Sequence, residues 1–218
     1  MYKELKKMSK TNSPEVFLRK LIYIPIIHTQ VDMGTLNEPI RQATLQNIGQ
    51  VALNRKIYLI DKMWTKIEQV IDGLDLSYKK VLLYQDGLPV CGEEFKIVTE
   101  LAKAGSRNHQ LLLRMMKKGA TIMGTESLEL LMEEYELAKQ VMTEENIQKS
   151  SAFRNLRKAL SDSLLNRRDQ FIANRINSTL SMGITGILFL GMLHSLENKL
   201  DSDIQVFKPI NQHFNAIN

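Results

Sequence analysis

The sequence predicts an α/β protein: a single domain with a mostly parallel sheet flanked by helices, and a long helix before the central strand. Two apolar runs, residues 21–28 (LIYIPIIH) and 184–194 (ITGILFLGMLH), have the length of buried strands and both end on histidine. Between them lie segments of helical periodicity, with connections too long for hairpins. Because a membrane span needs about 20 apolar residues, we expect residues 184–194 to form the central strand instead.

The composition is that of an ordinary globular protein, with 44% hydrophobic and 24% charged residues in a chain of 218. We divide it into a polar N-terminal arm (1–18), a single α/β domain (19–210) and a polar C-terminal tail (211–218). Cys91 is the one cysteine, which excludes an internal disulfide, and no export signal is recognisable. These features predict a cytoplasmic protein.

The formal charge of +5 does not predict a nucleic-acid partner, because the basic residues are spread along helices among acidic ones and aromatics make up only 6% of the chain. No membrane partner is expected either. The expected partner is a small-molecule or peptide substrate. The periodicity of residues 151–180 also allows a homo-oligomer formed through that long helix.

In the first half of the chain, a strand at 21–28 is followed by a loop over residues 29–38. Loops of this length often carry function. Residues 41–71 place apolar side chains mostly at three- and four-residue steps, which predicts an amphipathic helix ending at Gly73. The apolar run 81–87 (VLLYQDG) then predicts the second strand.

A helix is next expected with Glu93 and Glu94 in its first turn, a bend at residues 104–106 and an end at Gly119. Residues 120–126 (ATIMGTE) predict a short third strand. Ser127 has the chemistry of an N-cap for the helix that follows.

Another helix start is predicted at Thr143, before two glutamates. The longest helix is expected over residues 151–180, and its apolar stripe contains Arg168, four positions after Leu164. Residues 203–209 (DIQVFKP) offer a last strand.

Candidate site residues follow the predicted strands. In an open parallel sheet, ligands bind beyond the carboxyl ends of the strands. This rule brings His28, Asp86, Glu126 and His194 to one edge, where Arg168 can reach them from the long helix.

Imidazole and carboxylate ligands suit Zn, Mn, Co or Fe, and such an ion can activate water as a nucleophile near neutral pH. Two histidines with one or two of these carboxylates could therefore hold such an ion and leave room for water. Without a metal, either histidine could act as a general base oriented by a carboxylate.

Structural roles remain open for each of these residues. A histidine that closes a strand is often simply hydrogen-bonded. Glu126 could stabilise the N-terminus of the next helix, and Asp86 could shape a turn. The aliphatic part of the Arg168 side chain could pack in the core while its guanidinium stays in water.

The other chemically capable side chains receive less weight. We expect His109 on a helix surface and His213 in the polar tail to be solvated. Cys91 lies near a helix N-terminus but has no histidine close in sequence. Met192, like most methionines, is expected to be apolar filler, although it is also a conceivable haem ligand.

The block NRRDQFIANRI (166–176), followed after a spacer by GILFLGMLH (186–194), resembles the TraB/Tiki and ChaN/erythromycin-esterase-like superfamily. Arg168-Asp169 matches its Arg-Asp helix pair, and Gly191-Met-Leu-His194 matches its GxxH strand end. His28 aligns with an early GxxH, and Glu126 with a later acidic residue. This chain departs from the pattern at Pro25, which replaces the first glycine, and at Gln85-Asp86, where relatives commonly have glutamate.

The resemblance implies an α/β fold with a site built from the two histidines, Glu126 and Arg168, associated with metal-dependent peptide cleavage, ester hydrolysis or haem binding. The resulting hypothesis is a metal-dependent hydrolase of peptide or ester bonds, with His28, His194 and Glu126 as metal ligands and Glu126, Asp86 and Arg168 as catalytic residues. Asp86 would orient a ligand or complete the shell, and Arg168 would bind a substrate carboxylate or developing negative charge. The alternative is a non-catalytic protein that binds haem or another small ligand at the same edge. A third possibility is a subunit whose long helix serves only assembly.

Overall fold

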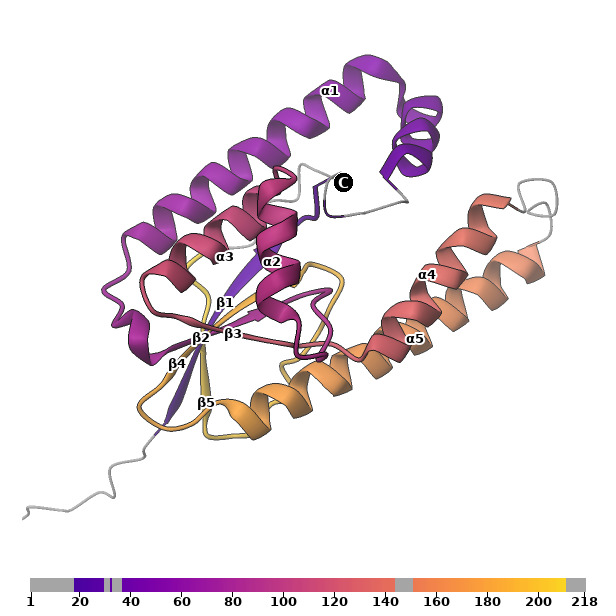
Figure 1. Ribbon diagram of the computed structural model, residues 1–218. Helices are drawn as coiled ribbons and strands as arrows, with labels where there is room; N and C mark the ends of the chain where they lie inside the picture. The colour runs from indigo at the N-terminus through magenta and orange to yellow at the C-terminus, as the bar shows by residue number, and fades with distance from the viewer. Residues whose placement is uncertain (1–17, 30–31, 33–36, 144–150, 211–218) are drawn as a thin grey trace, which may run out of the picture.

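The computed structural model describes residues 18–29, 32, 37–143 and 151–210. Five strands of this part of the chain form one parallel sheet in the order β3-β2-β4-β1-β5, which confirms the predicted α/β class (Figure 1). They are β1 (Arg19–Ile26), β2 (Val81–Gln85), β3 (Thr121–Met123), β4 (Thr185–Gly191) and β5 (Ile204–Phe207). The strand from the second histidine-ended run, β4, lies in the middle of this order, as predicted.

The helices also follow the predicted order. They are α1 (Asn37–Asp72), α2 (Glu94–Lys103), α3 (Arg107–Lys117), α4 (Leu128–Thr143) and α5 (Ser151–Thr179), with a 3-10 turn, η2 (Tyr78–Lys80), before β2. The bend expected at residues 104–106 is a complete break, because the Ser106 side chain caps a new helix by accepting a hydrogen bond from the His109 backbone N–H. At Gly49, α1 is kinked by a φ of 76°.

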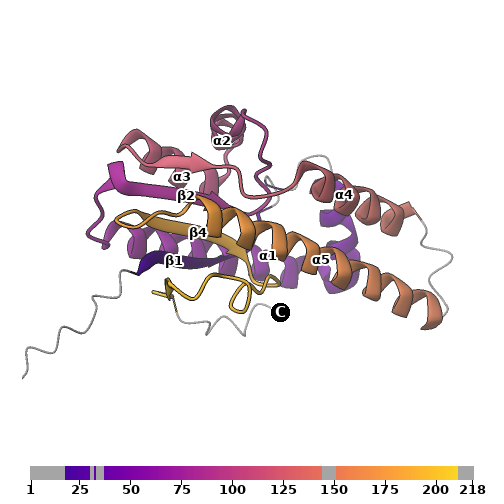
Figure 2. The ribbon, with the colours of Figure 1, turned by 90° about the horizontal axis from the view of Figure 1, so that it is seen from below.

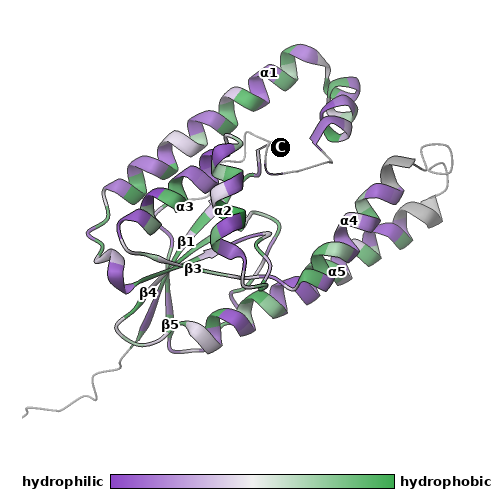
Figure 3. Ribbon diagram, viewed as in Figure 1, coloured by the Kyte–Doolittle hydropathy of each residue, from purple (hydrophilic) through white to green (hydrophobic). Residues whose placement is uncertain are grey.

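The sheet is covered on both faces. One core joins β-strand residues such as Ile24 and Leu83 to α1, α2 and α3, with Trp64 fully buried among them. The other core joins Leu188 and neighbouring strand residues to Ile172 and the rest of the apolar face of α5. Figure 2 shows α1 and α5 on either side of the sheet, and Figure 3 shows the alternating hydropathy of α1 that this amphipathic placement requires.

Helices α4 and α5 run side by side and extend away from the sheet (Figures 1 and 2). An ion pair between Glu133 and Arg167 joins them. None of the described helices is both long enough and apolar enough to span a bilayer.

Several predictions fall outside the described residues. They concern the arm up to residue 17, the tail from residue 211 with His213, and most of the loop at 29–38. The helix start predicted at Thr143 falls on the last residue of α4, and residues 144–150 beyond it are not described.

Candidate functional site

The strand register brings the two strand-ending histidines to the same edge. Ile26 pairs with Gly191 in neighbouring parallel strands, so His28 and His194 follow β1 and β4 at nearly the same level. On the other side of β4, β2 pairs through Gln85, and Asp86 comes directly after it. The carboxyl ends of three adjacent strands therefore bring a carboxylate and two imidazoles together, at the edge where open parallel sheets bind ligands.

Asp86 is the centre of this group and is 5% exposed. Its Oδ2 lies 3.0 Å from Nε2 of His28 and accepts a 2.9 Å hydrogen bond from the Gly191 backbone N–H. Its Oδ1 accepts a 3.0 Å hydrogen bond from Arg168 and lies 3.5 Å from Nε2 of His194. A single buried carboxylate thus joins both histidines to the arginine.

Gly191, the glycine of the GxxH sequence, is needed for this contact. A Cβ added there would lie 2.8 Å from Oδ2 of Asp86, which is closer than real Cβ atoms come to other atoms, and 3.6 Å from the His194 ring. The Asp86 carboxylate can sit directly against the end of β4 only because this residue has no side chain.

Arg168 is held by three carboxylates. Its guanidinium donates two hydrogen bonds, of 2.6 and 3.2 Å, to the Glu126 carboxylate, in addition to its hydrogen bond to Asp86. A third carboxylate, Glu134 of α4, accepts a 2.5 Å bond. The Arg168 side chain is 6% exposed, so the alternative in which its guanidinium stays in water is wrong. Because its N–H groups already bond to carboxylates of the protein, Arg168 positions the acidic residues of the site.

One residue of the site, Asp169, is not among those predicted from the sequence. Its Oδ1 lies 2.6 Å from Nδ1 of His194, and its Oδ2 accepts a 3.0 Å hydrogen bond from the Ser195 backbone N–H. These contacts fix the imidazole so that Nε2 faces Asp86. The sequence does contain an indication of its role, because Asp169 directly follows the predicted site residue Arg168 in the Arg-Asp pair.

Each pKa in the group reflects competition between burial and neighbouring charge. Burial alone would lower the pKa of His194, but hydrogen bonds to Asp169 and Asp86 raise it to about 9. Burial likewise opposes charge on His28, whose pKa is nevertheless raised by its bond to Asp86. Burial opposes ionisation of Asp86 too, but the two imidazoles hold its pKa well below the usual range.

Glu126 behaves differently from Asp86. Burial raises its pKa above the ordinary value, and although the Arg168 guanidinium opposes this shift, the nearby Asp86 carboxylate adds to it. Two carboxylates that share one guanidinium therefore differ in proton affinity, a pattern common at functional sites.

Three of these side chains could hold a metal ion. One ligand atom each from Asp86, Glu126 and His194 lie within 4.8 Å of one another. The Asp169–His194 contact has the form of the carboxylate–histidine pairs that orient metal ligands, and carboxylate oxygens bonded to Arg168 keep further lone pairs. The donor set therefore fits a borderline divalent ion. The third predicted ligand, His28, reaches Asp86 from a more open position, with its side chain 28% exposed.

The placement predicted for His109 is wrong: it is buried, not solvated. Its Nδ1 lies 2.7 Å from the Ser106 hydroxyl and 3.3 Å from Asp32, whose carboxylate also accepts a 2.5 Å bond from Ser106. Because Ser106 caps α3, this network ties the helix to the loop after β1. Ser106 is fully buried, and its role is to cap the N-terminus of α3.

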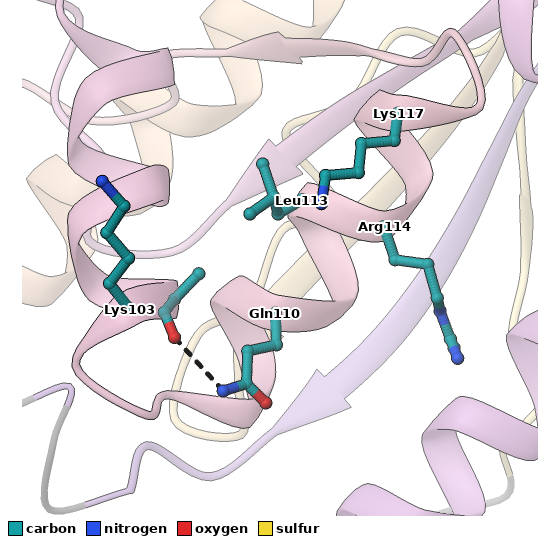
Figure 4. Close-up of a pocket in the computed structure, with 6 residues that line it drawn as sticks. Lys103, Gln110, Leu113, Arg114 and Lys117 are labelled. Atoms are coloured by element: carbon teal, nitrogen blue, oxygen red, sulfur yellow. Dashed lines mark hydrogen bonds between the residues drawn. The ribbon is translucent and has the colours of Figure 1, made fainter.

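Hollows in the surface of the described residues include two with different relations to the site. One, of about 160 Å³, is bordered by His194 and lies against β1, β4 and β5. The other, of about 330 Å³, lies between α2 and α3 and contains no member of the Asp86 cluster (Figure 4). In it, Gln110 of α3 donates a hydrogen bond to the Ala102 carbonyl of α2, with the side chains of Lys103 and Arg114 nearby. Of these two hollows, the first borders the candidate site through His194.

Comparison of the chain with protein-family models, with curated proteins and with solved structures gave no match. The fold and the candidate site therefore rest on the residues and their geometry.

Proposed function

We propose that this protein is a metal-dependent hydrolase of peptide or ester bonds, of the type suggested by the resemblance to the TraB/Tiki and ChaN/erythromycin-esterase-like superfamily. The observation that carries the proposal is the convergence of Asp86, Glu126 and His194, with His194 held by Asp169. Buried acid–base groups with perturbed pKa values at the carboxyl edge of a parallel sheet are typical of catalytic sites.

In this proposal, His194, Glu126 and Asp86 contribute ligands for a divalent transition metal, and His28 completes the set from the exposed side. The chemistry that such an ion supplies is Lewis-acid activation of water and of a carbonyl group. Asp169 keeps His194 in the orientation that points Nε2 at the site. Arg168 balances the negative charge of Glu126 and Asp86, which lets two buried carboxylates lie side by side.

The chain's own residues also provide for proton movement. The His28 imidazole is bonded to Asp86 and partly exposed, so it can exchange a proton with a substrate that approaches from solvent. The ligand role and the proton-transfer role of His28 differ in one measurable way. Only the ligand role makes metal content depend on this residue.

The deciding experiment is metal content by plasma mass spectrometry after incubation with Mn, Co, Zn or Fe and exhaustive dialysis. We compare wild type with His194→Ala, His28→Ala and Asp86→Asn, and use His109→Gln as a control that changes a buried histidine outside the cluster. Circular dichroism melts verify that each variant is folded. Metal that is near-stoichiometric in wild type and the control, and lost in His194→Ala, supports the proposal.

A wild type that retains none of these metals, or a folded His194→Ala that retains as much as wild type, contradicts the metal site. Hydrolysis of p-nitrophenyl esters and of a mixed peptide library by the metal-loaded protein then tests the reaction. Catalysis that survives His194→Ala unchanged would place the chemistry elsewhere.

The haem-binding alternative has less support. Both nitrogens of His194 lie near carboxylates, and the hollow beside it is about 160 Å³, whereas ligand pockets usually measure about 300–1,000 Å³. Titration with haem separates the two functions. A Soret band that depends on His28 or Met192 would favour the alternative.

We further infer that the protein acts in the cytoplasm, because its one thiol, Cys91, is free and exposed.

We also propose self-association through the α4–α5 pair, on which Leu128, Met132, Leu156 and Leu160 are exposed. Sedimentation of wild type against a Leu156→Glu Leu160→Glu variant tests this association. A monomeric wild type would contradict it.

A further inference from the structure

The hollow beside His194 has the properties of a pocket for an apolar substrate group. It lies on the α5 side of the sheet, where Leu21 of β1, Leu188 of β4 and Val206 of β5 form its floor. The segment after β4 contributes Leu196 and Leu200 as the opposite wall. Of the residues bonded to Asp86, His194 is the one that borders this pocket.

The size of the pocket limits what it can receive. Its volume is about 160 Å³. An engineered apolar cavity of about 150 Å³ in another protein stays dry and binds benzene, so a group of about six carbons or fewer would fit. Burial of each methylene improves binding about fourfold, until the pocket is full.

The rim of the pocket is polar. Tyr23 is one of the residues that line the pocket. Burial raises the pKa of Tyr23 to about 12, with a further contribution from the Asp86 charge, so the phenol is a hydrogen-bond donor at neutral pH. Lys208, which pairs with Glu197 across the rim, holds its ammonium 5.5 Å from the centre of the Tyr23 ring.

From this geometry we propose that the pocket receives the acyl chain of a short-chain carboxylic ester, with the Tyr23 hydroxyl donating a hydrogen bond to the ester carbonyl oxygen next to His194. The inference rests on the proposed hydrolase function and specifies its substrate class. Water adds across the acyl C–O bond, and the products are a short-chain carboxylic acid and an alcohol. Val206, on the edge strand β5, sets the length of chain that fits.

Binding is tested first, without catalysis. Acetamide, butyramide and hexanamide are neutral carbonyl probes, and they are titrated into chelator-treated protein while Leu and Val methyl resonances are followed by NMR. We expect saturable shifts at Leu21, Leu188 and Val206, with affinity rising about fourfold per added methylene. Val206→Phe should abolish the gain from acetamide to hexanamide. Tyr23→Phe should weaken all three probes without changing the trend.

No saturable shift at these methyl groups, or an unchanged trend in Val206→Phe, overturns the pocket. A Tyr23→Phe variant that binds all three probes as wild type does overturns the role given to its hydroxyl. Thermal melts verify the fold, and Val206→Ala provides a variant that enlarges the pocket if the phenylalanine variant does not fold. That variant should extend the preference to longer chains.

Hydrolysis of p-nitrophenyl acetate, butyrate and octanoate is measured second, with metal-loaded protein. We expect wild type to prefer butyrate, and Val206→Phe to prefer acetate. Hydrolysis with the same chain-length preference in both proteins refutes the pocket but not the hydrolase. Amide binding in the pocket with no ester hydrolysis refutes the hydrolase, and with it the ester as substrate.

Discussion

Nδ1 of His194 lies 2.6 Å from Oδ1 of Asp169, a contact between the end of the central strand and the helix that precedes it by 25 positions. The same carboxylate accepts a hydrogen bond from the Ser195 backbone N–H. Asp169 therefore fixes both the ring and the backbone beside it. The orientation of His194 at the candidate site therefore depends on a residue of the preceding helix.

This contact predicts the effect of Asp169→Asn. An amide keeps the size of the carboxylate but removes its charge, so the orientation and basicity of His194 change while the fold remains. We expect metal affinity or hydrolytic activity to fall about 10- to 100-fold. Asp162→Asn, an exposed position on the same helix, is the control and should retain wild-type values. Equal activity in the two variants would remove Asp169 from the site.

Replacement of Arg168 by methionine should strongly destabilise the protein. The change leaves Glu126 and Asp86 buried without their cation, which typically costs about 3–5 kcal/mol in the free energy of unfolding. Urea denaturation measures this cost. Arg167→Met, which removes an exposed pair with Glu133, should change stability by at most about 1 kcal/mol.

The double variant Arg168→Met Glu126→Gln tests whether the cost arises from the uncompensated carboxylate. Because the neutral amide no longer needs a cation, we expect the double variant to be less destabilised than the sum of the two single changes. The coupling free energy should be about 0.5–3 kcal/mol. Additive effects would mean that Arg168 does not act through Glu126.

Gly191→Ala should damage the site without removing a polar group. The new Cβ would lie 2.8 Å from Oδ2 of Asp86 and displace the carboxylate that joins the two histidines. Gly186→Ala is a matched control on the same strand, because its Cβ would lie 2.8 Å from the Leu21 side chain instead.

Both alanine variants should lose about 1–3 kcal/mol of stability from overpacking. Only Gly191→Ala should shift the imidazole NMR signals of His28 and His194 and reduce metal content. A normal site in a folded Gly191→Ala would show that the close contact is not required.

The Asp32 network predicts an acid-dependent loss of stability. Burial alone would raise the pKa of Asp32, but hydrogen bonds from His109, Ser106 and Thr29 outweigh it and lower the pKa to about 2. The folded state therefore holds the ionised form more strongly than the unfolded chain, whose pKa is 3.8. The stabilisation is fully present above pH 3.8 and disappears as the pH falls through about 2.

Urea denaturation of wild type and Asp32→Asn at several pH values measures this effect. The stability difference should be about 2 kcal/mol at pH of about 6 and should narrow steadily below pH of about 4. Asp61→Asn, at an exposed carboxylate, should show a much smaller difference. A constant gap between Asp32→Asn and wild type across this range would contradict the lowered pKa.

Local patterns of the sequence predicted most of the fold. Apolar runs and three- to four-residue spacing identify strands and helices because each depends on which side chains must be buried along a short segment. The alternation of these elements then leaves few arrangements other than a parallel sheet, and β4 lies at its centre. Boundaries were less well predicted: β3 is Thr121–Met123, shorter than the expected strand at 120–126, and Glu126 forms a separate, isolated bridge with Pro89.

The sequence by itself also determined which side chains reach the edge of the sheet, since the position of His28, Asp86 or His194 follows from where its strand ends. Only the tertiary structure decided which groups bond to one another. The rotation of α5 against the sheet turned Arg168 and Asp169 inward, onto Glu126 and His194. The packing of α3 buried His109, which its local sequence suggested was exposed. Strand ends are set by neighbours in the chain, whereas these contacts join residues far apart in sequence, and only the packing of helices on the sheet fixes their distances.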